Sequence, residues 1–300
     1  MSKVTTHHLA ALRERGERAA FVTAYDYPTA HYADRAGADM LLVGDSAAMT
    51  MLGLPSTLGI GMEEMLVFAR AVSRAAKRAF VIGDMPFLSY QPSDECAIRN
   101  AGAFLASAGC DAVKCEGGGR VSRRVYAMVN AGIPVMGHLG LTPQSAAQSG
   151  GYKVQGKSFD AVKRILSDAL VLQAAGVFAL LLEAMPAESA AYVRDHLRIP
   201  VYGIGAGPQL DGQLLICHDL LGSFVGDISP RFAKRYAELG TVTEAAFRAY
   251  VADVRGGHFP EPQHCYPLDP SAEAEIRGAR PESKPDAPSG RAQLPEPIAG

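Results

Sequence analysis

The sequence has no tryptophan, no Cys-x-x-Cys pair and no long apolar run, and each absence excludes a kind of protein. Its apolar runs are far shorter than the roughly 20 residues that a membrane-spanning helix needs. Residues 1–18 are rich in charge and lack the apolar core of a signal peptide. The five cysteines are odd in number, so neither a disulfide framework nor a cysteine zinc site is expected. We therefore expect a cytoplasmic protein.

Strong net charge is also missing, which argues against two classes of partner. The formal net charge is -2 and the isoelectric point is near 6.4. Nothing in this balance favours binding to nucleic acid or to an anionic membrane surface. With 48% hydrophobic and 20% charged residues, the composition is that of a globular protein with a large core.

Eight short apolar runs recur along the chain, mostly separated by segments with helical spacing of apolar residues. Continuous apolar strands that alternate with helices are typical of a parallel sheet covered on its outer side. Eight such units in about 250 residues predict an α/β fold, a (β/α)8 TIM barrel. A doubly wound open sheet is the alternative, and it is weakened because no Gly-x-Gly-x-x-Gly follows the first run. The runs are 19–24, 40–44, 79–83, 112–116, 133–137, 177–182, 199–203 and 213–217.

The composition changes near residue 260, where prolines become frequent and aromatic residues rare. We therefore expect a single barrel domain over residues 1–263, with an N-terminal helix over 9–18 and a C-terminal helix over 230–255. Residues 264–300 cannot build a packed core, and we expect them to form a Pro-rich, mostly disordered tail.

Ionisable groups close nearly every apolar run. In a barrel the carboxyl ends of the strands meet at one mouth, so these groups are expected to converge there. A single aspartate after a strand is usually a helix cap or a turn former, and only convergence gives the set a chemical meaning. The closing groups are Asp26, Asp45 with Ser46, Asp84, Lys114 with Glu116, His138, Glu183, and His218 with Asp219.

Three of these groups, Asp45, Asp84 and Glu116, offer only oxygen donors. Carboxylates placed together repel one another unless a cation lies between them. Hard oxygen ligands without cysteine indicate Mg2+ or Mn2+ rather than zinc. Lys114 precedes Glu116 by two residues on a predicted strand, so both side chains face the same way. Its charge would stabilise an anionic substrate or a developing enolate.

Glu183 and His138 complete the predicted set. Glu183 ends a fully apolar run, where a carboxylate can have a raised pKa and act as a general base, or can simply cap the next helix. For His138 we favour a hydrogen-bonding role beside the ligands over metal binding or a core position. The glycines 117–119 are expected to let the backbone approach a ligand closely. Together these groups predict an enzyme that removes a proton next to a carbonyl and then forms or cleaves a carbon–carbon bond.

The segments that close the runs resemble the motifs of the ketopantoate (3-methyl-2-oxobutanoate) hydroxymethyltransferase family. The resemblance runs in order from about Ala19 to about His264 and includes several long motifs. The matching segments are Thr23-Ala24-Tyr25-Asp26-Tyr27, Val43-Gly44-Asp45-Ser46, Asp84-Met85-Pro86-Phe87, Val113-Lys114-Cys115-Glu116-Gly117-Gly118, the stretches 137–144 and 150–156, Leu182-Glu183, and Gly203-Ile204-Gly205-Ala206-Gly207.

This resemblance implies a barrel of the phosphoenolpyruvate/pyruvate superfamily type and a defined reaction. A one-carbon hydroxymethyl unit passes from 5,10-methylenetetrahydrofolate, the co-substrate, to 3-methyl-2-oxobutanoate through a Mg-stabilised enolate. The product is 2-dehydropantoate, on the path to pantothenate and coenzyme A. The resemblance also implies a homo-oligomer, a decamer of two pentamer rings. It implies Mg2+ ligands Asp45, Asp84 and Glu116, an oxoacid site of Asp45, Ser46, Asp84 and Lys114, and Glu183 as the general base.

The sequence departs from the family pattern in two places near the predicted site. Ala47 and Ala48 stand where the family usually has a glycine, and residues 57–61 replace a Thr-Leu-Pro-Val-Thr-like stretch. Two other hypotheses stay open. One is a different metal-dependent lyase or aldolase of the same superfamily, acting on a related oxoacid. The other is a non-catalytic barrel kept for assembly or regulation, which predicts the loss of a site residue, and none is lost.

Overall fold

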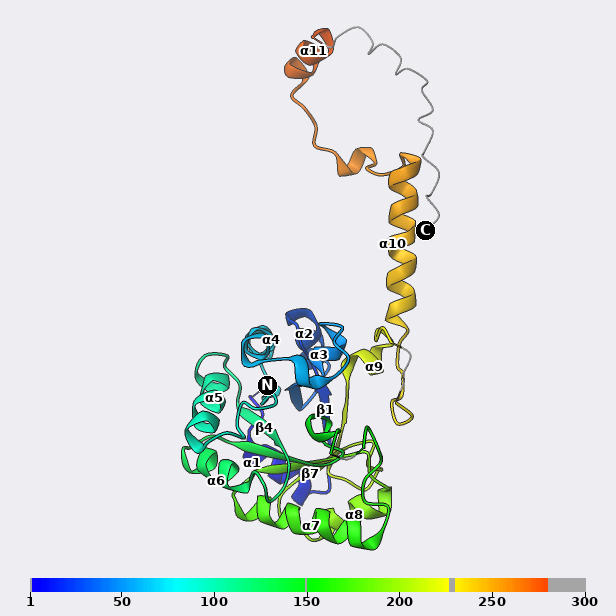
Figure 1. Cartoon of the computed structure of the whole chain (residues 1–300). Coiled ribbons are helices and arrows are strands. Elements are labelled where there is room, and N and C mark those ends of the chain that lie inside the picture. Colours follow the sequence, from blue (N-terminus) through cyan, green and yellow to red (C-terminus); the bar gives the residue numbers. More distant parts are fainter. Residues whose placement is uncertain (1, 149, 227–229, 280–300) are drawn as a thin grey trace, which may run out of the picture. The chain divides into compact units, whose positions relative to one another are not determined.

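In the computed structural model, eight parallel strands pair in chain order and the eighth pairs with the first, which closes a barrel (Figure 1). The structure describes residues 2–148, 150–226 and 230–279. The closed barrel confirms the predicted (β/α)8 fold over the open sheet. The strands are β1 (Ala19–Thr23), β2 (Met40–Val43), β3 (Phe80–Asp84), β4 (Ala112–Glu116), β5 (Val135–Gly140), β6 (Ala179–Glu183), β7 (Val201–Ile204) and β8 (Gly212–Leu215).

Helices cover the outer side of this barrel. Helix α4 (Met62–Ala75) packs on β2 and β3, α5 (Asp94–Ala106) packs on β4, and α7 (Phe159–Ala174) packs on β5. The other elements up to residue 221 are α1 (Thr6–Glu14), α2 (Tyr27–Arg35), α3 (Ala47–Thr50), the 3-10 helix η1 (Thr57–Gly59), α6 (Ser122–Asn130), the 3-10 helix η2 (Pro143–Ser145), α8 (Ala187–Asp195) and α9 (Cys217–Leu221).

The strands alternate their side chains between two apolar clusters. Met40 and Leu42 of β2 point into the barrel interior, whereas Leu41 and Val43 pack against the outer helices. Leu9 and Leu12 of α1 belong to the interior cluster. Because α1 fills the interior from the amino ends of the strands, the polar side chains are left to the carboxyl ends.

Two predicted helices have different bounds in the structure. The helix expected over 9–18 covers Thr6–Glu14, because the Thr5 side chain accepts the N–H of His8 and sets an earlier start. The helix expected over 230–255 covers only Leu239–Gly256, which is α10. In the preceding stretch the N–H of Tyr236 donates to the carbonyl of Leu220, so this backbone is held by α9 instead of continuing a helix.

The chain divides into two compact units, Met1–Val242 and Thr243–Gly300. The second unit contains most of α10, the 3-10 helix η3 (Pro262–His264) and α11 (Pro270–Gly278). Helix α11 therefore lies inside the predicted tail of residues 264–300, and residues 280–300 of that tail lie outside the described residues. Within the part of the chain that is described, no helix has the length and apolar character needed to cross a membrane.

Asp34 of α2 connects this helix to the backbone that leads into β3. Its carboxylate accepts the backbone N–H groups of Lys77, Arg78 and Ala79 at 3.0, 2.9 and 2.6 Å, just before β3 begins. Burial alone would raise the pKa of Asp34, but the hydrogen bonds from Ala79, Lys77 and Arg78 outweigh it and hold this pKa below its usual value. The folded chain therefore favours the charged form of Asp34.

We expect Asp34→Asn to lower the free energy of unfolding at pH 7 by about 1–3 kcal/mol, because it leaves a buried N–H without its acceptor. A lowered pKa gives stability that is complete above the ordinary aspartate pKa of about 3.9 and is lost as the pH falls through the folded value. Urea unfolding at pH 7 and in acid checks this, since the gap between parent and variant must shrink in acid. The control Asp160→Asn, at an exposed side chain, is expected to stay within about 0.5 kcal/mol.

Candidate active site

Asp45, Asp84, Lys114 and Glu116 come together, buried, at the carboxyl ends of β2, β3 and β4. The Nζ atom of Lys114 lies 2.8 Å from Oδ1 of Asp84 and 3.7 Å from Oε1 of Glu116. The backbone N–H of Asp45 donates to Oδ2 of Asp84 at 3.0 Å. The parallel register places Asp84 beside Lys114, so the fold itself brings these charges into contact.

The cluster carries more negative than positive charge. Burial, and then the carboxylates of Asp84 and Glu116, raise the pKa of Asp45 well above its usual value. Burial also raises the pKa of Asp84, against the opposing effect of Lys114. Burial by itself would lower the pKa of Lys114, but Asp84, Glu116 and Asp45 outweigh it and the pKa is raised. Lys114 is therefore charged, and the excess negative charge of the three acids calls for another cation.

The donor chemistry fits Mg2+. Asp45, Asp84 and Glu116 offer buried carboxylate oxygens, the kind of ligand that Mg2+ prefers, although Oδ1 of Asp84 already faces Lys114 at 2.8 Å and Oε1 of Glu116 faces His138 at 3.4 Å. Among the residues that the structure describes, no three His, Cys, Asp or Glu side chains are grouped so that they alone could hold a metal ion. Mg2+ is usually held by one or two carboxylates together with water and substrate oxygens, which this cluster can provide. Direct binding by all three predicted ligands stays a prediction.

His138 links this cluster to Glu183. Its Nδ1 lies 3.2 Å from Nζ of Lys114 and 3.4 Å from Oε1 of Glu116, and its Nε2 lies 3.2 Å from Oε2 of Glu183. Burial and Lys114 lower the pKa of His138, but its contacts with Glu116 and Glu183 outweigh them and raise the pKa to about 9. Burial would raise the pKa of Glu116. The contacts with His138 and Lys114 outweigh burial and hold this pKa below its usual value. His138 therefore bridges the carboxylates of Glu116 and Glu183.

Ser46 and Asp26, two other polar groups that follow strands, have different surroundings. Oγ of Ser46 lies 2.7 Å from the hydroxyl of Tyr25, which is fully buried. Ser46 directly follows Asp45 and is half-buried, so its hydroxyl is available beside the acids. Asp26 instead caps α2, because its side chain accepts the N–H of Thr29 at 2.8 Å. It thus has the capping role that a lone aspartate after a strand usually has.

The three glycines after Glu116 lie against neighbouring segments of the chain, and their expected approach to a ligand stays a prediction. Gly117 has φ +110°, a conformation that favours glycine. A side chain at Gly118 would overlap the carboxylate of Asp168 on α7. The N–H of Gly119 donates to Oδ1 of Asp168 at 2.8 Å. These glycines therefore fit the chain between β4 and α7.

Gln144 of η2 belongs to the acidic cluster, although neither residue type nor spacing singled it out within the matching stretch 137–144. Its Nε2 donates to Oδ2 of Asp45 at 2.9 Å, and its backbone N–H donates to Oε2 of Glu116 at 3.0 Å. It lies in a long non-periodic segment, where spacing carries no information about contacts. Residues 57–59, part of the stretch that differs from the family pattern, form η1, and η1 contacts η2. Ala47 and Ala48, the other departure, are fully buried in α3.

Glu183 is held by its backbone as well as by His138. Its carbonyl accepts the N–H of Leu141 at 2.8 Å, and the N–H of Ala184 donates to the carbonyl of Ile204 at 2.9 Å. Gly140 pairs with Glu183 in the sheet, has φ +87°, and has no room for a side chain, which would collide with the carbonyl oxygen of Glu183. Ala184 has φ +47°, which is uncommon for a residue other than glycine. The end of β6 is therefore tightly constrained.

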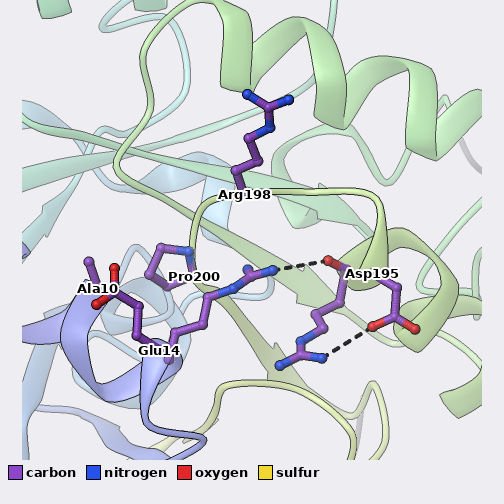
Figure 2. Close-up of a pocket in the computed structure, with 7 residues that line it drawn as sticks. Ala10, Glu14, Asp195, Arg198 and Pro200 are labelled. Atoms are coloured by element: carbon purple, nitrogen blue, oxygen red, sulfur yellow. Dashed lines mark hydrogen bonds and ion pairs between the residues drawn. The ribbon is translucent and has the colours of Figure 1, made fainter.

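A pocket at the opposite, amino end of the barrel contains none of these groups (Figure 2). There Asp211 pairs with Arg13 of α1 at 3.1 Å and with Arg194 of α8 at 2.7 Å, and it accepts the N–H of Val201 at 2.8 Å. These contacts fasten α1 and α8 to the start of β7, so the arginines have a structural role. The pocket is lined by Ala10, Arg13, Glu14, Arg194, Asp195, Arg198 and Pro200.

Comparison with known sequences finds one family. The sequence model described as ketopantoate hydroxymethyltransferase matches residues 3–262. The chain is 53% identical over 265 residues to the 3-methyl-2-oxobutanoate hydroxymethyltransferase of Moorella thermoacetica. The aligned residues cover 88% of this chain and 98% of that protein. It is 55% identical over 243 residues to the protein of that name from Syntrophobacter fumaroxidans, covering 81% of this chain and 86% of the relative.

Solved structures with the same fold come from more distant proteins. A phosphonopyruvate hydrolase in complex with oxalate and Mg++ superposes with a TM-score of 0.57 at 13% identity, covering 93% of this chain and 95% of that one. A 2,3-dimethylmalate lyase, a member of the PEP mutase/isocitrate lyase superfamily, superposes with a TM-score of 0.53 at 17% identity, with the same two coverages. These likenesses show the barrel fold.

We expect Gly140→Ala to lower the free energy of unfolding by about 2–5 kcal/mol, because it adds a collision with the backbone of Glu183 to the strain of a positive φ. Gly132→Ala is the matched control. Gly132 has φ +84° but nothing within 4 Å of the added carbon, so we expect strain alone, about 1–2 kcal/mol. Urea unfolding of the two variants and the parent measures the difference. Equal losses would show that the carbonyl of Glu183 does not constrain Gly140.

Proposed function

The chain belongs to the ketopantoate hydroxymethyltransferase family, and from this premise we propose that it transfers a one-carbon unit from 5,10-methylenetetrahydrofolate to 3-methyl-2-oxobutanoate. The product is 2-dehydropantoate, on the path to pantothenate. Its relatives carry the name of a hydroxymethyltransferase, and this chain is an enzyme of that kind. The observation that carries the finer proposal is the continuous contact from Asp84 through Lys114 and His138 to Glu183.

Lys114 and Ser46 are proposed to bind the oxoacid. The ammonium of Lys114 is fixed by Asp84 and Glu116, so it offers a positive charge whose position does not depend on the substrate. A fixed charge of this kind stabilises negative charge in the transition state without the cost of reorganising. The hydroxyl of Ser46 is available as a donor to the same substrate, beside the carboxylate of Asp45.

Glu183 is proposed as the base that removes the proton from the branched carbon of the oxoacid. Its side chain is 17% exposed, whereas those of Asp84 and Glu116 are 2% exposed. It is therefore the carboxylate of this set with the best access to substrate and water. The contact with His138 fixes one of its oxygens. When the C–H bond breaks, its electron pair moves into an enolate. Water hydrolyses the two C–N bonds at the folate methylene group, which returns a hydrogen to each nitrogen and leaves the carbon as formaldehyde. The enolate carbon then attacks this carbon, and its oxygen takes up the proton held by Glu183 to become the hydroxyl of the product.

Mg2+ is the proposed cofactor, held by Asp45, Asp84 and Glu116 directly or through water. When bound, it would act as a Lewis acid toward the oxygens of the oxoacid. Family membership is also the basis for proposing a homo-oligomer, a decamer, that works in the cytoplasm. The five cysteines support a reducing compartment, because all are free thiols in the structure.

The decisive measurement is the formation of 2-dehydropantoate from the two substrates. We expect product with Mg2+, none after the ion is removed with EDTA, and recovery when Mg2+ is added back, because the excess negative charge of the acids must be neutralised before an anionic oxoacid can bind. If no product forms under any condition while an aldol or retro-aldol reaction of a related oxoacid does, the chain is another lyase or aldolase of the superfamily. No turnover of any oxoacid would favour a non-catalytic barrel.

We expect Glu183→Gln to slow hydrogen exchange at the branched carbon of 3-methyl-2-oxobutanoate by about 10²–10⁴-fold, because the amide cannot accept the proton. Proton NMR in heavy water follows this exchange without the folate. Glu188→Gln, at an exposed glutamate in the first turn of α8, is the control and should exchange like the parent. Unchanged exchange in Glu183→Gln would place the base elsewhere.

A further inference from the structure

Gln144 is the residue through which the loop of residues 141–157 contacts the acidic cluster. It is 4% exposed. Besides its bond to Asp45, its Nε2 donates to the carbonyl oxygen of Met85 at 3.0 Å. The bonds to Asp45 and Glu116 join carboxylates that follow β2 and end β4, two strands separated by β3. One residue from a loop after β5 therefore connects both sides of the cluster.

Tyr90 supports the other end of this side chain. Its hydroxyl lies 3.3 Å from Oε1 of Gln144, donates to the carbonyl of Glu116 at 2.9 Å, and accepts the N–H of Glu116 at 3.0 Å. Tyr90 is fully buried, so this arrangement is fixed by packing. Both polar ends of Gln144 and both polar backbone groups of Glu116 thus have partners.

The rest of the loop is fastened to the strands that carry the site. Arg120, which follows the glycines after Glu116, donates to Oγ of Ser145 at 3.3 Å and to Oε1 of Gln148 at 2.8 Å. The N–H of Gln155 donates at 2.9 Å to the carbonyl of Ala184, the residue after Glu183. The loop therefore touches the chain next to Glu116 and next to Glu183.

We propose that Gln144 is a positioning residue that holds Asp45 and Glu116 in the arrangement that takes up a divalent cation, so that cation binding depends on the seating of this loop. The inference rests on the proposed function, because it takes the acidic cluster as the cation site. It assigns a role to a residue that neither titrates nor touches the reacting atoms.

The chemistry of an amide suits this role. Neighbouring carboxylates repel each other, and a neutral donor offsets that repulsion without adding a positive charge that competes with the cation. Each N–H also fixes one oxygen of its carboxylate, as with Oε2 of Glu116, whose other oxygen faces His138 at 3.4 Å. Residues that hold metal ligands in place typically contribute 10- to 100-fold to metal affinity.

The test measures Mn2+ binding to the full chain without substrates, from the electron paramagnetic resonance signal of the free ion. Gln144→Met keeps the size of the side chain and removes both of its polar ends. We expect it to raise the dissociation constant about 10- to 100-fold. Gln209→Met is the matched control, because Gln209 is an exposed glutamine outside this loop, and we expect no change. Hydrogen exchange over residues 141–157 should be faster in Gln144→Met than in the control.

Tyr90→Phe is the second variant and decides the matter if Gln144→Met does not fold, as judged by circular dichroism. It removes the hydroxyl beside Gln144 and Glu116, so we expect a smaller rise in the Mn2+ dissociation constant. If the parent binds Mn2+ and the folded variants bind it equally well, the inference is overturned and the proposed function stands. A parent that binds no Mn2+ would overturn both the inference and the proposed cation site.

Discussion

The rest of the polar interior depends on the buried ammonium of Lys114. Its Nζ lies 2.8 Å from Asp84 and 3.7 Å from Glu116, in a region from which water is excluded. Removing one partner of a buried pair costs about 3–5 kcal/mol, because the other charge is left uncompensated. The register that sets Asp84 beside Lys114 therefore serves two purposes. It pairs β3 with β4 in the barrel, and it fixes a buried positive charge at the carboxyl ends of these strands.

Apolar packing at the other end of the barrel makes this arrangement possible. Leu9 and Leu12 of α1 pack with Met40 and Ile82 of the strands and fill the interior from the amino ends. Since side chains alternate along a strand, the inward positions nearer the carboxyl ends come next, and in β4 these are Lys114 and Glu116. The same alternation thus produces an apolar floor and a charged mouth. The charged side chains are buried because the change from apolar to charged inward residues occurs within the strand itself.

The sequence predicted the barrel and the mouth well, because both follow from local patterns. Each apolar run became a strand, and the polar residues that end or follow β2 to β6 needed only the closed topology to meet one another. Gln144 and the contact of Gly118 with Asp168 could not be predicted in this way, since both join segments whose spacing says nothing about their approach. Asp26 also follows a strand, but its side chain caps the helix that comes next instead of joining the acidic cluster. The specific roles came from the resemblance of motifs.

The absence of charge on Gln144 bears on the proposed cation site. A lysine in place of Gln144 would also hold Asp45 and Glu116 together, but its ammonium would cancel the negative charge that attracts the ion. An apolar residue would leave the repulsion between the carboxylates unopposed. An amide that donates to Asp45, together with a backbone N–H that donates to Glu116, orders both carboxylates and leaves their charges intact. Lys114 can then remain the ammonium of the cluster, next to Asp84 and His138, and under the proposed function it would face the oxoacid instead of replacing the metal.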